Sequence, residues 1–194
     1  MGKLDGKKIA FLFTDGVEQV ELDKPAEAVR DAGAEIDYIS LDDGEIQAFN
    51  HLDQADKIKV DTAVKDADAS DYDALLLPGG VANPDFLRMD EDAVAFVRSF
   101  VEQAKPIGSI CHGPWTLVEA DVVKGRTLTS FPSIRTDIRN AGGNWVDEEV
   151  HVDEGLVTSR KPDDIPAFTE KIVEEFCEGE HEGMKESAGA GAAS

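Results

Sequence analysis

The sequence predicts an α/β fold in which helices cover both faces of a mainly parallel sheet. Short apolar runs without helical periodicity, Lys8–Phe13 and Ala74–Leu77, are typical of strands buried on both faces. They alternate with amphipathic segments, of which Asp90–Gln103 is the clearest because its apolar residues recur every three to four positions. Strand–helix alternation of this kind is typical of a parallel sheet sandwiched between two helical layers.

The other elements follow from local signals in chain order. Pro25 in a first turn and Gly33 after the last one predict a helix over 25–32, and Asp90 is a good cap for the helix that follows it. Residues 44–61 form an irregular excursion that could be a hairpin. Further strands are expected at Glu35–Leu41, Pro106–Ile110 and Arg126–Thr129, with a hairpin formed by Glu149–Val152 and Leu156–Ser159. Further helices are expected at Gly113–Ala120, Ile134–Ala141 and Asp164–Phe176.

The chain of 194 residues suits one folded domain, which we place at residues 1–178. Residues 179–194 are charged and then rich in Ala, Gly and Ser, a composition that predicts a disordered tail.

Composition excludes several classes of protein. Asp plus Glu number 41 against 19 Lys plus Arg, a net charge of -22, so electrostatic binding of nucleic acid is excluded. No apolar run is long enough for a membrane helix or a signal peptide, and we expect a cytoplasmic protein. The acidic surface fits either ordinary solubility or a salt-rich cytoplasm. Two cysteines without a CxxC or His/Cys cluster predict no disulfide framework, metal site or cofactor site.

The strongest chemical signal is the segment from Ile107 to Pro114, where an apolar strand leads into Cys111 and then a helix. The small residues Ser109 and Gly113 lie two positions on either side, which is the spacing of a nucleophile elbow. We therefore expect Cys111 to project from the sheet edge at a helix N-terminus, whose dipole favours the thiolate. Cys177, on the last helix, has no such surroundings and is expected to be structural or partly exposed.

Two neighbouring segments could complete a site around this cysteine. His112 could supply a backbone N–H to an oxyanion hole and its imidazole as a general base. Gly79 and Gly80 follow a buried strand, and their N–H groups could provide further oxyanion or substrate contacts.

The loop after the first strand carries four acidic residues, Asp15, Glu18, Glu21 and Asp23. We expect three of them to be solvated and one to face the thiol. Burial and like charge would raise the pKa of that carboxyl group, so that it could act as an acid. The residues alone do not distinguish Glu18 from Glu21.

Together these segments resemble the ThiJ/PfpI family, also called the Parkinsonism-associated deglycase superfamily. The resemblance rests on Ser109–Pro114, Leu77–Gly80 and Asp15–Leu22, with supporting matches at 129–134, 140–147 and 157–164. It covers about residues 7–177 and is strongest to the PfpI-like branch, which includes intracellular proteases and glyoxalase or deglycase enzymes.

The resemblance implies a flavodoxin-like three-layer sandwich and a nucleophile at Cys111. It places Glu21 at the thiol and Glu18 in a supporting role. It also implies that an acid at Asp85 reaches the histidine across a subunit interface, which requires a homo-oligomer, either a dimer or a hexamer. This chain has one extra residue in that turn and an Asp where the branch has Glu.

Three functions are therefore considered. In the first, a glyoxalase III-like or deglycase-like hydrolase, Cys111 adds to a small aldehyde or a glycated protein. In the second, an intracellular cysteine peptidase, Cys111, His112 and Asp85 hydrolyse a peptide through a thioester. In the third, a non-enzymatic stress-response protein or chaperone, Cys111 senses oxidants. Glutamine amidotransfer is disfavoured because no correctly spaced His-x-Glu pair is present.

Overall fold

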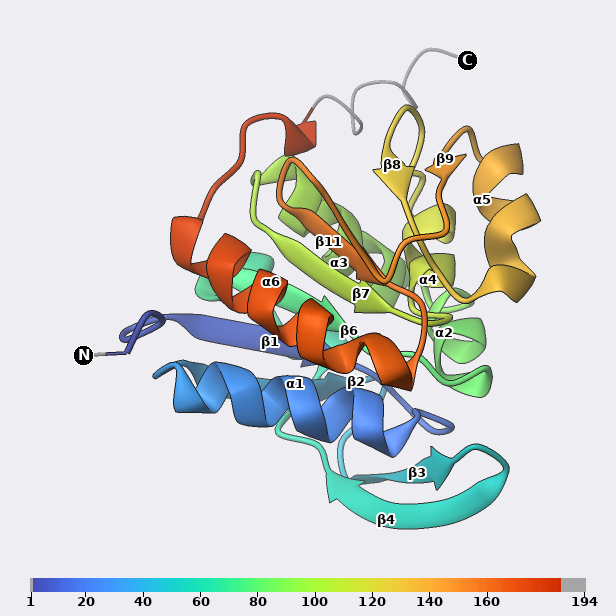
Figure 1. Cartoon of the computed structure of the whole chain (residues 1–194). Helices are drawn as coiled ribbons and strands as arrows, with labels where there is room; N and C mark the ends of the chain where they lie inside the picture. Colours follow the sequence, from blue (N-terminus) through green and yellow to red (C-terminus); the bar gives the residue numbers. More distant parts are fainter. Residues whose placement is uncertain (1, 186–194) are drawn as a thin grey trace.

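The computed structural model describes residues 2–185 and confirms the predicted α/β sandwich with a mostly parallel sheet (Figure 1). Seven strands form the main sheet in the order β10-β11-β7-β6-β1-β2-β5. All neighbours are parallel except β10 and β11. The strands are β1 (Lys8–Leu12), β2 (Glu35–Ser40), β5 (Thr62–Ala63), β6 (Ala74–Leu77), β7 (Ile107–Ile110), β10 (Val150–Asp153) and β11 (Leu156–Ser159). The central five, β2-β1-β6-β7-β11, follow the order of flavodoxin-like sheets.

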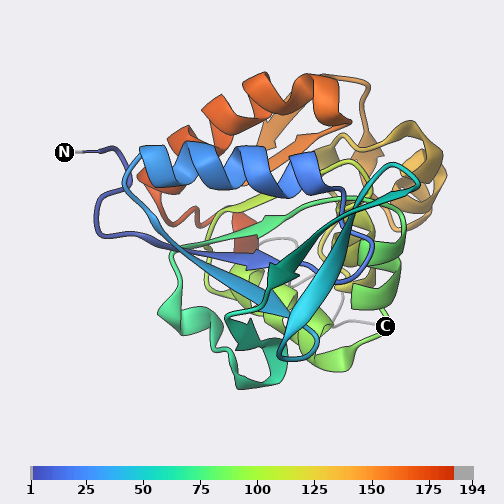
Figure 2. The same ribbon diagram turned by 90° about the horizontal axis from the view of Figure 1, so that it is seen from below.

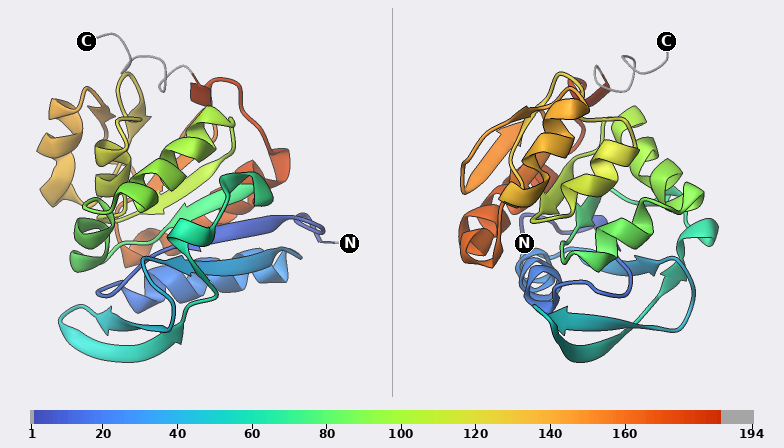
Figure 3. Two further views of the ribbon diagram at one scale, coloured as in Figure 1. Left: turned by 180° about the vertical axis from the view of Figure 1, so that it is seen from behind. Right: turned by 90° about the vertical axis from the view of Figure 1, so that its right-hand side faces the viewer.

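Helices pack on both faces of this sheet. Helices α1 (Gln19–Asp31) and α6 (Ile165–Glu178) lie side by side on one face. The other side carries α2 (Ala82–Leu87), α3 (Glu91–Glu102), α4 (Pro114–Glu119) and α5 (Arg135–Asn140), and Figure 3 shows the two helical layers edge-on. Strand β6 illustrates the packing, because Leu75 and Leu77 join one core cluster while Ala74 and Leu76 join the other.

The excursion at 44–61 is a hairpin of β3 (Glu45–Asn50) and β4 (Asp53–Lys59), separate from the main sheet. Figure 2 shows it crossing the lower side of the molecule, with its tip near the beginning of α1. A second small sheet pairs β8 (Thr127–Leu128) with β9 (Asn144–Trp145). The strand predicted at 126–129 therefore forms, but outside the main sheet.

Helix α1 begins at Gln19, so the predicted start at Pro25 is wrong. Pro25 lies inside the helix, where it removes one backbone hydrogen bond. Burial of Leu22, Pro25 and Ala26 against the sheet offsets that loss. The earlier start places Glu21 in the first turn of a helix rather than in a loop.

The predicted tail needs a correction as well. Residues 179–185 pack against the domain: the His181 N–H donates to the Ala104 carbonyl at 2.7 Å, and Met184 is only 1% exposed. Arg126 Nη2 donates to the Gly183 carbonyl at 3.0 Å. These contacts satisfy backbone groups and bury an apolar side chain, which composition alone does not reveal. Residues 186–194 of the predicted tail lie outside the described residues. No helix within residues 2–185 is both long and apolar enough to cross a membrane.

Candidate active site

The predicted site residues after β1, β6 and β7 meet at the carboxyl edge of the sheet, where ligands bind in folds of this class. Cys111 follows β7 directly and has a φ of 62°, a left-handed conformation that is strained for a non-glycine residue. Gly113 permits the turn, since a Cβ there would lie 2.6 Å from the Leu77 carbonyl oxygen and 2.7 Å from Ser109 Oγ. This backbone has the predicted elbow geometry, and Cys111 is 7% exposed.

Glu21 is the carboxyl group that lies beside the thiol. It is fully buried, and its Oε2 accepts a hydrogen bond of 2.9 Å from the Gly79 N–H. Burial raises the pKa of Glu21 to about 8, while its hydrogen bond with Cys111 opposes the shift and the charge of Glu18 adds to it. Glu21 therefore holds a proton through most of the neutral range.

The Cys111 thiol shares this environment. Burial, and then the neighbouring Glu21 carboxylate, raise the pKa of Cys111 above its ordinary value. The expectation that the helix N-terminus lowers the thiol pKa is therefore wrong, because α4 begins only at Pro114 and desolvation dominates. Sulfur and carboxyl together keep at least one proton at neutral pH. The sulfur therefore keeps its proton as well, and His112 Nδ1, 3.2 Å away, is the group placed to accept it when the thiolate forms.

The imidazole of His112 approaches the sulfur from the other side. Its Nδ1 lies 3.2 Å from Cys111 Sγ, and its Nε2 lies 3.0 Å from Ser133 Oγ. The ring stacks on Phe131 with centroids 4.7 Å apart. Burial lowers the pKa of His112, so the ring is neutral at pH 7 and can accept or relay a proton.

Backbone N–H groups of Gly80 and His112 face the sulfur and lower its pKa slightly. They fit the predicted role of oxyanion donors. Gly79 does not fit it, because its N–H is already bonded to Glu21. Gly79 instead leaves room for the two reactive side chains, because a Cβ at this position would lie 2.4 Å from Glu21 Oε2 and 2.6 Å from Cys111 Cβ.

Glu18 lies at the pocket wall and is tied to the β3–β4 hairpin. Its Oε2 accepts a hydrogen bond of 3.0 Å from the His51 N–H, and its backbone forms a bridge with Phe49. Glu18 thus holds the hairpin tip next to the pocket, and its supporting role at the thiol stays a prediction.

A pocket of about 430 Å³ opens above the thiol. Glu18, Glu21, Cys111 and His112 supply its reactive groups. The remaining walls are mostly apolar or glycine, formed by Gly16, Phe49, His51, Leu52, Gly80, Val81, Ala82, Phe131 and Pro162.

Asp85 lies elsewhere on the surface, on α2. Its half-exposed carboxylate accepts a hydrogen bond of 3.1 Å from Arg88 Nε, whereas His112 Nε2 faces Ser133. A contact between Asp85 and a histidine across a subunit interface stays a prediction.

Sequence reasoning assigned no role to His51, Phe131 and Ser133. His51 and Phe131 line the pocket, and Ser133 orients His112. Phe131 and Ser133 lie in the segment 129–134, which matches the family pattern. That match is the signal in the sequence that could have placed them near the site. His51 is placed by the register of the hairpin, which the sequence alone does not determine.

The chain and its fold are similar to those of known proteins. The model of the DJ-1/PfpI family matches residues 7–175. The chain is 46% identical over 167 residues to "Putative cysteine protease YraA" of Bacillus subtilis, covering 86% of this chain and 96% of that protein. It is 43% identical over 168 residues to "Protein/nucleic acid deglycase 2" of Escherichia coli, covering 86% and 96%. The crystal structure of Drosophila melanogaster DJ-1beta superposes with a TM-score of 0.80 at 28% identity, covering 98% of this chain and 97% of that one.

Proposed function

Because the chain belongs to the DJ-1/PfpI family, we propose that it is a cysteine-dependent enzyme that acts on reactive carbonyl compounds without a cofactor. One observation carries the proposal: Cys111 lies in a strained elbow between a protonated carboxyl group and a neutral imidazole, at the base of an apolar pocket. Such a pair can deliver a thiolate and a proton to the same carbonyl group.

The reaction with methylglyoxal illustrates the roles. The Cys111 sulfur passes its proton to His112 Nδ1 and bonds to the aldehyde carbon, while the oxygen takes the proton that Glu21 holds, giving a hemithioacetal. The N–H groups of Gly80 and His112 stabilise the charge on that oxygen as the bond forms.

Glu21, now a carboxylate, removes the proton from the former aldehyde carbon and returns a proton to the adjacent carbon through an enediol. The product of this transfer is a thioester of lactate on Cys111. Water then attacks the thioester: Glu21 takes a proton from the water, and His112 returns its proton to the sulfur. Lactate and one proton leave, and the thiol and both side chains are restored. The net change is addition of one water molecule, so no redox partner is needed.

The same attack by sulfur suits early glycation adducts on protein side chains. The net charge of -22 disfavours approach of a polyanion, so protein adducts and small aldehydes are better substrates than nucleic acid on this ground.

Peptide hydrolysis is the second candidate, favoured by the contact between Cys111 Sγ and His112 Nδ1. It requires an acid for the histidine, which we assign to Asp85 of a second copy in a homo-oligomer. The exposed apolar side chains Val81, Phe86 and Met89 flank Asp85 and suit such a contact. Peptidase activity should therefore depend on assembly and be lost in Asp85→Asn, which carbonyl turnover should tolerate.

The test is consumption of methylglyoxal with detection of lactate, at low and high salt. We expect turnover in the wild type and in Cys177→Ala, the exposed-cysteine control, and none in Cys111→Ala. If the wild type is inert at every salt concentration while Cys111 still reacts rapidly with iodoacetamide, the carbonyl proposal fails for this substrate. Peptide hydrolysis or oxidant sensing would then be the better account.

A further inference from the structure

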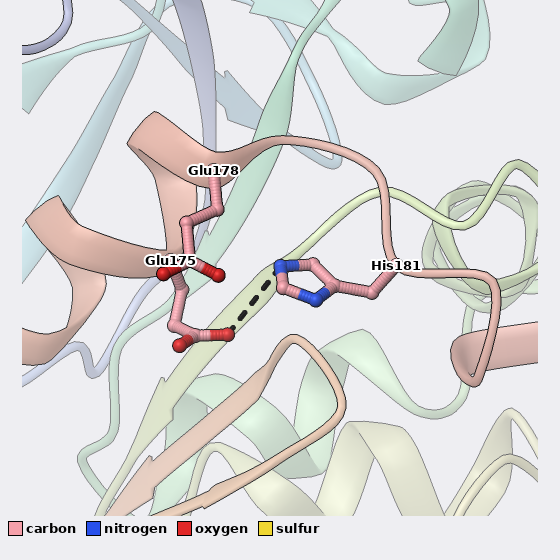
Figure 4. Close-up of side chains that lie close together, drawn as sticks. All are labelled: Glu175, Glu178 and His181. Carbon is pink, nitrogen blue, oxygen red and sulfur yellow. Dashed lines mark ion pairs between the residues drawn. The ribbon is translucent and has the colours of Figure 1, made fainter.

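Three potential metal ligands meet at the opposite edge of the sheet from Cys111. Glu175 and Glu178 come from the last turn of α6, and His181 comes from the segment that follows it (Figure 4). One ligating atom from each side chain lies within 4.8 Å of the other two. Among residues 2–185, no other group of three His, Cys, Asp or Glu side chains brings its ligating atoms this close together.

Two of these groups, Glu175 and His181, face each other and are largely shielded from solvent. Glu175 is only 9% exposed, and no hydrogen bond joins its carboxylate to other described residues. The Nε2 atom of His181 is buried and has no hydrogen-bond partner among the described residues. The Glu175 carboxylate and His181 Nε2 form an ion pair, which carries opposite charges only when the imidazole is protonated. Buried polar atoms in proteins almost always have a partner, and a cation shared by both atoms would give each of them one when the imidazole is uncharged.

The spacing of these two atoms suits a metal ion. Glu175 Oε2 and His181 Nε2 are 3.4 Å apart. Two ligands at about 2.0–2.1 Å from a tetrahedral zinc ion are separated by about 3.3–3.4 Å. Glu178 is exposed at the helix end, so its side chain can rotate to close the remaining distance.

The surrounding structure holds the imidazole in place. The His181 N–H is bonded to the Ala104 carbonyl at 2.7 Å, and the ring lies against Gly155, where a Cβ would be 2.7 Å from its Cδ2 atom. Buried Met184 anchors the same segment. A cation here would also lie at the C-terminal end of α6, where the helix dipole favours positive charge.

We propose that Glu175, Glu178 and His181 bind one divalent transition-metal ion of the zinc type, with water completing its coordination. An imidazole beside two carboxylates favours such an ion over Ca²⁺ or Mg²⁺, which prefer oxygen ligands. Two carboxylates, a neutral imidazole and a divalent cation form a neutral group, which lowers the cost of burying Glu175. The ion fixes residues 179–185 to α6 and therefore stabilises the fold. The site is independent of the proposed carbonyl chemistry.

The test is calorimetric titration of Zn²⁺ into the full chain. Cys111→Ala and Cys177→Ala are introduced together to remove thiol ligands, and excess Mg²⁺ with salt suppresses diffuse binding to the acidic surface. We expect one Zn²⁺ per chain and an affinity at least about tenfold weaker in His181→Gln, since loss of even an outer-shell partner costs 10–100-fold. His151→Gln is the matched control, because it removes another His–Glu pair, His151 Nδ1 with Glu148 at 2.7 Å, without affecting the site.

Two further readouts complete the experiment. Zn²⁺ should raise the melting temperature of the parent and of His151→Gln but not of His181→Gln. Co²⁺ should give the absorption spectrum of nitrogen and oxygen ligands. Glu178→Gln, at an exposed position, should weaken binding in the same way and replaces His181→Gln if that variant does not fold. Equal affinity in the variants and the control, or binding abolished by Mg²⁺ and salt, would overturn the proposal.

Discussion

Glu21 and Glu175 are buried at opposite edges of the same sheet, and the groups that surround their carboxyl groups differ. Burial raises the pKa of both Glu21 and Glu175. Glu21 accepts a hydrogen bond from the Gly79 N–H and lies beside the Cys111 thiol, and its raised pKa lets it hold a proton through most of the neutral range. Glu175 instead forms an ion pair with the ring of His181 at 3.4 Å and lies close to Glu178. Similar burial thus supports acid–base chemistry at one edge and suits a cation at the other.

One residue at each edge, Ala104 and Cys111, has a left-handed backbone, and the structural reason differs between the two. Ala104 has a φ of 60° and follows α3, where the Lys105 N–H donates to the Phe100 carbonyl and closes the helix end. That is ordinary helix capping. Cys111 has nearly the same φ, but it follows a strand and no helix end requires it. Only the second strained residue indicates a reactive site.

The largest difference between the two edges should appear in activity. We expect Glu21→Gln to lower kcat/KM for methylglyoxal by about 10²–10⁴-fold, because proton transfer by a positioned side chain contributes that much. Glu175→Gln, a matched change at the other edge, should leave kcat/KM unchanged. Steady-state kinetics on both variants, with circular dichroism to confirm folding, measures this. Equal losses in the two variants would mean that the carboxyl groups act only through the fold.

The pH dependence of stability should show the proton that Glu21 holds. Its pKa is raised from 4.5 to about 8, so between these values the folded chain binds a proton that the unfolded chain has released. Its contribution to stability is present at low pH and is lost as the pH rises through about 8, with a slope of up to about 1.4 kcal/mol per pH unit. The free energy of unfolding of the wild type, minus that of Glu21→Gln, should fall over this range in denaturant titrations. A flat difference would show that Glu21 is ionised in the folded protein.

How much of this comparison is visible in the sequence depends on how local each signal is. The Cys111 elbow is predictable because Ser109 and Gly113 lie within two residues of it. Glu21 could not be separated from Glu18 because Pro25 resembled a first-turn proline, which hid the true start of α1 at Gln19. With that start, Glu21 falls on the buried face of the helix and Glu18 at its N-cap.

Other features depend on contacts between distant segments. His51 reaches the pocket only through the register of β3 and β4, and Ser133 reaches His112 only because the chain returns after β8. The cluster at the other edge needs His181 folded back onto α6, and composition predicted that segment to be disordered. The periodicity of apolar residues predicts single helices and strands well. It does not predict which loops and element ends come into contact in the folded chain.

A smaller effect should distinguish substrates at the carboxyl edge. Leu52 is 93% exposed at the hairpin tip and lines the pocket mouth. An aldehyde with an aromatic substituent would cover part of this side chain, so Leu52→Ala should raise KM for phenylglyoxal about fivefold, worth about 1 kcal/mol, and leave methylglyoxal unaffected. Met89→Ala, which removes an exposed side chain outside this pocket, is the control. The same change in KM for both aldehydes would exclude Leu52 as a selective contact.

The smallest difference between the buried carboxyl group and the rest of the molecule is expected in the response of the melting temperature to salt. Exposed carboxylates that carry the net charge of -22 repel one another, and salt screens that repulsion, so the melting temperature should rise from low to high salt. Screening hardly reaches a fully buried group, so the rise should be the same in the wild type and in Glu21→Gln. Differential scanning calorimetry of both proteins across a salt series measures this. An equal rise in melting temperature in the two proteins would assign the salt response to the surface carboxylates and support adaptation to a salt-rich environment. A smaller rise in Glu21→Gln would mean that water and ions reach the thiol. In that case the pKa of Glu21 would lie nearer its usual value, and the assignment of Glu21 as the proton donor would fail.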